Sequence, residues 1–136
     1  MSPTILKINS FDEAVSEISK VKANPVGVQI MTLKAVYRLV KFEAVDPKTA
    51  NIVKQEMLSR GGDVAVSEKV AQFEKAKTDI IIMGTLAQPL RLINKLKTQP
   101  FGECLEIADA LQTCYSKTLI SHLQVPGKPI CLPKLL

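Results

Sequence analysis

The sequence contains no tryptophan, and aromatic residues make up only 4% of the chain. Proteins that bind single-stranded nucleic acid commonly stack bases on aromatic side chains, and few are present here. The fifteen lysines and three arginines outnumber the thirteen acidic residues, but they form no basic block along the chain. The net charge of +5 is therefore only mildly basic, and we do not expect nucleic-acid binding.

Cysteine and histidine are also scarce, with three cysteines and one histidine in the chain. An odd number of cysteines without C-x-x-C spacing argues against a disulfide framework and against a zinc site. Cys104 and Cys114 read as small core residues, and His122 lies near no Ser, Cys or Asp in a nucleophile arrangement. The sequence thus predicts no catalytic residue, no metal and no cofactor.

Long hydrophobic runs and nucleotide-binding loops are missing as well. No apolar run approaches the roughly 18 residues of a membrane span, and the N-terminus lacks the pattern of a signal peptide. The phosphate-loop signature G-x-x-x-x-G-K-[ST] and the dinucleotide signature G-x-G-x-x-G are both absent. We expect a cytoplasmic protein without a membrane partner.

A chain of 136 residues with 46% hydrophobic and 23% charged residues is typical of one soluble globular domain. Because aromatic residues are few, its core is expected to be aliphatic. We predict one domain over residues 1–123, followed by an extended C-terminal tail over 124–136, where Pro126, Pro129 and Pro133 preclude regular helix.

Local signals predict several secondary-structure elements. Ser10 and Glu13 form a capping box, Asp46-Pro47 is a strong helix start, and Gly61 is suited to end a helix. Residues 67–77 carry no clear signal for either a helix or a strand. The expected helices run over about 11–21, 47–60, 86–97 and from 103 onward, and the expected strands over 4–8, 26–31, 37–45, 64–66 and 79–85.

This order of elements predicts an α/β fold, with a small mixed β-sheet layered against about four helices in a single domain. The run over residues 79–85 is continuously apolar and β-branched, as in a central strand covered on both faces. The residues expected to face the core from the helices are Phe11, Val15, Ile18, Ala50, Val53, Met57, Leu58, Leu86, Leu90, Ile93, Leu96, Cys104, Ile107, Ala108, Leu111, Cys114 and Tyr115.

Two glycine-containing turns are candidate ligand sites. Gly84-Thr85 ends a buried strand and precedes a helix whose free N–H groups could bind an anion, although a simple helix cap at Thr85 is the favoured interpretation. Arg60-Gly61-Gly62-Asp63 could be a ligand loop or simply a helix stop. Four polar residues on the exposed side of the preceding helix could contribute to binding or be solvated charges: Asn51, Lys54, Gln55 and Glu56.

Several segments resemble the N-terminal extension of clostridial-type dihydropteroate synthases, over about Asn24 to Leu111. They are NPVGVQIM (24–31), VKFE (40–43), ANIVKQEMLSRGGD (50–63), TDIIIMGT (78–85) and KLKTQPFG (95–102). In that family the extension precedes a (β/α)₈ barrel, which joins a pterin pyrophosphate to p-aminobenzoate in folate synthesis. The barrel's Asn-Val-Thr-Pro-Asp-Ser-Phe motif has no counterpart here, so no catalytic residue is carried over.

The resemblance implies a non-catalytic accessory domain that associates with a barrel-type pterin- or folate-binding partner or with itself. The alternative is a domain that binds a small anionic or pterin-like ligand between the two glycine turns, which must then lie within about one ligand's width, around a pocket of roughly 300–1,000 Å³. The candidate interface or ligand residues are Asn51, Lys54, Gln55, Glu56, Arg60, Gly61, Gly62, Gly84, Thr85, Gln99 and Phe101.

Overall fold

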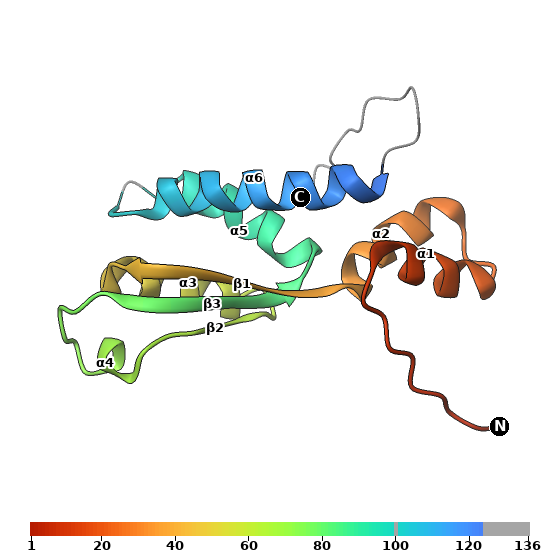
Figure 1. Ribbon diagram of the computed structural model, residues 1–136, viewed down its shortest axis with the longest axis horizontal. Coiled ribbons are helices and arrows are strands. Elements are labelled where there is room, and N and C mark those ends of the chain that lie inside the picture. Colours follow the sequence, from red (N-terminus) through yellow and green to blue (C-terminus); the bar gives the residue numbers. More distant parts are fainter. Residues whose placement is uncertain (100, 124–136) are drawn as a thin grey trace.

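The computed structural model describes residues 1–99 and 101–123, which form an α/β domain (Figure 1). The α/β class predicted from the sequence is confirmed. The tail predicted over 124–136 lies outside the described residues. In chain order the elements are α1 (Phe11–Lys20), α2 (Pro25–Ala35), β1 (Tyr37–Val45), α3 (Pro47–Leu58), β2 (Asp63–Ala65), α4 (Glu68–Ala71), β3 (Thr78–Thr85), α5 (Ala87–Lys97) and α6 (Cys104–Leu123).

The three strands form one sheet in the order β1-β3-β2, so β3 is the central strand, as its apolar run predicts. Both pairings are antiparallel, whereas a mixed sheet was expected. The difference arises because β3 inserts between β1 and β2 and runs opposite to both of them. Leu39 lies opposite Met83 in one pairing, and Val64 lies opposite Ile82 in the other.

One face of the sheet is covered by helices. α3 packs against β2 and β3, α5 packs against β3, and α6 packs along α5, which places α5 and α6 together in Figure 1. Val40, Ile80 and Ile82 point into this layer and join a core made mostly of aliphatic side chains, as expected.

The other face of the sheet is largely exposed, and we call it the open face. Tyr37 and Leu39 on β1 are 52% and 60% exposed. Burial alternates along β3, so the expectation that residues 79–85 are covered on both sides is wrong for the described part of the chain. The open face consists of Tyr37, Leu39, Lys41, Glu43, Asp63, Ala65, Asp79, Ile81, Met83 and Thr85.

Two predicted strands are wrong. Residues 26–31 belong to helix α2, because Asn24 accepts a hydrogen bond from the Val26 backbone N at 2.9 Å and Pro25 occupies the first helical turn. Their β-branched composition suggested a strand, but the helix-start signals of Asn24 and Pro25 outweigh this preference. Residues 4–8 form no strand, and most of their side chains are exposed.

The helix boundaries follow the predicted signals closely. Glu13 N donates to Ser10 Oγ at 3.1 Å, and Thr49 N donates to Asp46 Oδ2 at 3.3 Å, so both predicted starts are confirmed. Two predicted core residues are exposed instead, Leu58 at the end of α3 and Cys114 on α6. The unassigned stretch 67–77 contains the single-turn helix α4.

Candidate functional site

The first glycine turn closes the C-terminal end of α3. Gly61 has φ +84°, the left-handed conformation that favours glycine, and the Gly62 backbone N donates to the Met57 carbonyl at 3.1 Å. A Cβ on Gly62 would lie 2.7 Å from the Met83 carbonyl oxygen. The turn therefore both ends the helix and packs its backbone directly on β3.

The structure brings the two glycine turns together through one side chain, that of Gln88. The Thr85 backbone N donates to Gln88 Oε1 at 2.9 Å, and Gln88 Nε2 donates to the Arg60 carbonyl at 3.0 Å. The amide thus satisfies a donor beside one turn and an acceptor beside the other.

The space between the turns is filled by protein atoms. A Cβ on Gly84 would lie 2.5 Å from Met57 Cε and 2.6 Å from Gln88 Oε1. A Cβ on Gly62 would lie 2.6 Å from the same Met57 methyl group. The small size of these glycines serves close packing around Met57 and Gln88.

The sequence suggested Thr85 as the cap of α5, but the Thr85 side chain does not cap this helix. Leu86 occupies the N-cap position without a side-chain cap, and Gln88 supplies the hydrogen bond to the Thr85 N–H. Sequence reasoning missed Gln88, although Thr85-Leu86-Ala87-Gln88 fits the capping-box spacing, in which the glutamine reaches back to the backbone.

The charged candidates on α3 and in the turn after it make local ion pairs. Arg60 Nη1 lies 2.7 Å from Glu56 Oε2, and Lys54 Nζ lies 3.1 Å from Asp63 Oδ1. Lys54 also donates to the Val64 carbonyl at 2.8 Å, and the Val64 N–H donates to Asp63 Oδ1 at 2.7 Å. The Val64 hydrogen bond, with the Lys54 ammonium next, holds the pKa of the exposed Asp63 carboxyl below its ordinary value.

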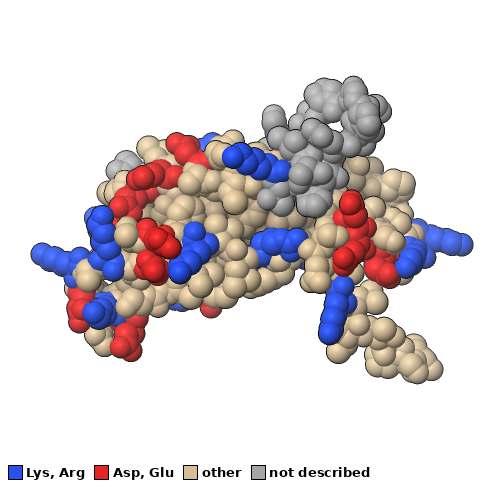
Figure 2. Space-filling view, in the orientation of Figure 1, with Lys and Arg blue, Asp and Glu red and all other residues tan. Residues whose placement is uncertain are grey.

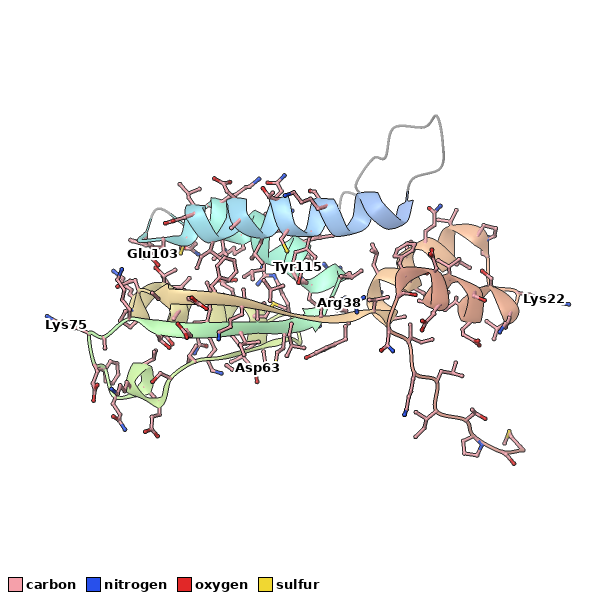
Figure 3. The ribbon with its side chains drawn as sticks, in the orientation of Figure 1. Lys22, Arg38, Asp63, Lys75, Glu103 and Tyr115 are labelled. Carbon is pink, nitrogen blue, oxygen red and sulfur yellow. The ribbon has the colours of Figure 1, made fainter. Side chains whose placement is uncertain are left out.

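Two further candidates lie at the other end of α3. Gln99 is half-buried and Phe101 is 47% exposed, with Lys48 Nζ 5.1 Å from the Phe101 ring centroid. The Glu103 backbone N donates to Thr49 Oγ1 at 3.1 Å, which fastens the start of α6 to α3. Figure 3 shows Glu103 at this end of the molecule.

The candidate residues therefore form two groups separated by the length of α3, about 18 Å for twelve residues. Asn51 and Gln55 lie on the exposed side of α3 between the groups. A surface hollow of about 380 Å³ exists between the N-terminal segment and α1, and no candidate residue lines it. The residues thus form two separate local arrangements.

Two potentially reactive groups are buried in α6. Burial raises the pKa of the Cys104 thiol, which favours its neutral form. Burial likewise raises the pKa of Tyr115, whose hydroxyl has no hydrogen-bond partner within the described residues. Figure 3 shows Tyr115 on the side of α6 that faces β1 and Arg38. Their surroundings thus favour the protonated forms of both groups.

The described residues contain no group of three His, Cys, Asp or Glu side chains placed to hold a metal ion. Within residues 1–99 and 101–123, no helix is long and apolar enough to cross a membrane. On the face shown in Figure 2, acidic and basic side chains are interspersed instead of separated into a patch of one sign.

Comparison with known proteins gives one relationship. The chain is 39% identical over 95 residues to a probable bifunctional folylpolyglutamate synthase/dihydropteroate synthase of Halobacterium salinarum. The match covers 70% of this chain but 11% of that relative. No protein-family model matches, and no solved structure matches. The chain is thus similar to a small part of a folate-pathway enzyme.

Proposed function

We propose that this chain is a non-catalytic accessory domain of folate biosynthesis, related to the N-terminal extension of dihydropteroate synthases. The observation that carries the proposal is the 39% identity to a segment making up 11% of a bifunctional folate enzyme. Such a short segment leaves most of that relative for its two named activities. The domain would act by associating with a barrel-type pterin- or folate-binding protein.

The side chains of the candidate site support association better than chemistry. Lys54, Glu56 and Arg60 are engaged in ion pairs within the domain, and the Gly61 and Gly84 turns are packed around Gln88. These groups hold α3, β2 and α5 together. The exposed polar candidates Asn51 and Gln55 remain available on the surface of α3 for a protein partner.

The proposal is tested with the purified chain and a purified dihydropteroate synthase that lacks this extension. Sedimentation velocity at about 50 µM of each protein should show a complex, because association in this range corresponds to roughly −6 kcal/mol. Replacing Asn51 and Gln55 with alanine should weaken it, whereas replacing the exposed Lys95 on α5 should not. The absence of any complex would count against the proposal. Condensation of a pterin pyrophosphate with p-aminobenzoate by the chain alone would overturn its non-catalytic part.

Ligand binding is the second candidate, because the two glycine turns are adjacent. A pterin-like or anionic ligand would need Gln88 to leave its bonds to Thr85 and Arg60. Titration with pterin and with inorganic phosphate, followed by amide chemical shifts, tests this candidate. Saturable shifts confined to residues 60–62 and 84–88 would support it, and unchanged spectra at millimolar ligand would exclude it.

A further inference from the structure

We propose that Arg38 and Tyr115 form a binding site for the carboxylate group of a small molecule, between the start of β1 and α6. The inference goes beyond the proposed function, because it concerns a small ligand and two residues outside the candidate site. Its test uses the chain by itself, so it can fail while the association with a synthase holds, and the reverse.

Arg38 lies on the covered side of β1. Its backbone pairs with Gly84 on β3, and Val40, the next residue on the same side of the strand, pairs with Ile82 in the core. The Arg38 residue is accordingly half-buried, whereas Lys41 on the open face is exposed. A cation beneath a helical layer loses part of its hydration, and such groups are normally paired with an acid.

No acidic side chain forms an ion pair with Arg38 in the part of the chain that the structure describes. Its guanidinium donates instead to two backbone carbonyls, from Nη1 to Tyr37 at 2.9 Å and from Nη2 to Asn9 at 2.5 Å. These bonds use two of the five guanidinium N–H donors, so others remain for a further acceptor. Carbonyl groups carry no net charge, and the positive charge of Arg38 is therefore not neutralised by them.

Tyr115 has a complementary unmet requirement. The residue is only 2% exposed, and its hydroxyl has no hydrogen-bond partner within residues 1–99 and 101–123. A buried hydroxyl without a partner destabilises a fold, so buried tyrosine hydroxyls usually have one. The Tyr115 hydroxyl can therefore donate to an acceptor that the described residues do not supply.

The two groups lie close together. Figure 3 shows Tyr115 on the side of α6 that faces β1 and Arg38. Burial raises the pKa of Tyr115 most, and the Arg38 charge opposes this rise, an effect that requires proximity. One anionic group between them would accept hydrogen bonds from both.

The site can be reached from the edge of the sheet. β1 is an edge strand, since β3 lies on one side of it in the sheet. Asn9, whose carbonyl accepts from Arg38, is exposed, and Tyr37 is 52% exposed. A small ligand can approach the guanidinium between these exposed residues and direct its anionic end toward Tyr115.

The balance of charge favours a carboxylate over other anions. A guanidinium supplies one positive charge and a planar set of donors that matches the two oxygens of a carboxylate. The Tyr115 hydroxyl adds a neutral donor. One cation and one hydroxyl balance a single negative charge, whereas a phosphate dianion would leave one of its charges unmatched.

Tyrosine fluorescence tests the inference, because the chain contains two tyrosines and no tryptophan. Tyr37→Phe leaves Tyr115 as the remaining tyrosine, and the Tyr37 side chain lies on the open face, away from the site. Propionate, added at constant ionic strength, should quench the fluorescence saturably with a Kd of about 1–10 mM, since the phenol would donate to a carboxylate. Propionamide has the same shape without the charge and should cause no change.

Arginine variants in this background separate the site from general charge effects. Arg38→Gln should raise the Kd for propionate at least about tenfold, whereas Arg91→Gln, at an exposed arginine on α5, should leave it unchanged. Arg38→Lys should retain part of the affinity, because the charge remains but the planar fork is lost. Circular dichroism checks that each variant folds, and Arg38→Lys replaces Arg38→Gln if the latter unfolds.

Tyr115→Phe distinguishes a ligand site from a purely structural role. Its Kd for propionate, followed by amide chemical shifts at residues 9 and 38, should rise about threefold or more. Without ligand, its urea midpoint should equal or exceed that of the wild type, because the substitution removes an unpaired buried hydroxyl. A lower midpoint would show that the hydroxyl already has a partner in the fold and would overturn the inference.

Three further results would overturn it. They are the absence of saturable quenching by propionate, an equal response to propionamide, and an unchanged affinity for propionate in Arg38→Gln. Tighter binding of inorganic phosphate than of propionate would overturn the assignment to a carboxylate. The complex with a dihydropteroate synthase is measured separately by sedimentation, so these results leave the proposed function intact.

Discussion

Gln88 and Arg60 lie 28 residues apart in the chain, and the Gln88 side-chain amide donates to the Arg60 carbonyl at 3.0 Å. Through its other atom, Gln88 Oε1, the same amide accepts from the Thr85 N–H at 2.9 Å. One side chain thus connects the end of α3 to the start of α5. The turn at residues 60–63, which the sequence offered as a possible ligand loop, therefore has a structural role at this junction.

Replacing Gln88 with leucine should destabilise the domain by about 1–2 kcal/mol, because the Thr85 N–H and the Arg60 carbonyl each lose a partner. Urea unfolding followed by circular dichroism measures the change. Gln55→Leu alters an exposed glutamine on α3 and should shift stability by less than about 0.5 kcal/mol. Equal effects of both substitutions would contradict the bridging role.

Gly62→Ala should destabilise the domain by about 1–3 kcal/mol. Its Cβ would lie 2.7 Å from the Met83 carbonyl oxygen, and relieving this contact requires a shift of the β3 backbone. Gly27 on α2 is the matched control, because a Cβ there would lie 3.6 Å from its nearest neighbour, the Met31 methyl group. At Gly27, alanine should stabilise by up to about 1 kcal/mol through helix propensity. Thermal unfolding of the two variants should therefore shift in opposite directions.

Thr49→Val should weaken the attachment of α6 to α3, because the buried Thr49 hydroxyl accepts from the Glu103 N–H at 3.1 Å. We expect the free energy of unfolding to fall by about 1–2 kcal/mol. Thr113→Val on the exposed side of α6 should have a much smaller effect. Hydrogen exchange should show faster exchange at the Glu103 amide in the first variant only, and unchanged protection there would argue against this contact.

Asp63 should make stability depend on pH in acid. Its pKa is lowered from 3.8 in the folded chain, so the folded state favours the carboxylate. The contribution is present above the unfolded pKa and is lost as pH falls through the lower folded pKa. Urea unfolding between about pH 2 and 6 should therefore show a weaker acid dependence for Asp63→Asn than for wild type. Asp12→Asn, on the exposed side of α1, serves as the comparison.

Local signals predicted much of the fold. Ser10, Asp46 and Gly61 act through neighbours within four residues, so their roles at the helix ends could be deduced from spacing. The continuous apolar run of β3 identified the central strand. The same method failed at residues 26–31, where apolar residues lie all around the helix and give no helical periodicity.

The candidate site was less predictable than the fold. Sequence patterns identified both glycine turns, but their proximity depends on how α5 returns to the end of α3. Gln88 was missed because its bond to Arg60 spans 28 residues, and no local spacing encodes such a contact. The ion pair between Lys54 and Asp63 likewise requires that β2 lie beside α3.

The sequence by itself determined the α/β class, the aliphatic core and most helix boundaries, since these depend on composition and on interactions within a turn or two of chain. Only the tertiary structure decided the strand order, the closeness of the two turns and the exposure of one face of the sheet. These features arise when β3 inserts between β1 and β2, a long-range pairing whose register local propensities leave undetermined.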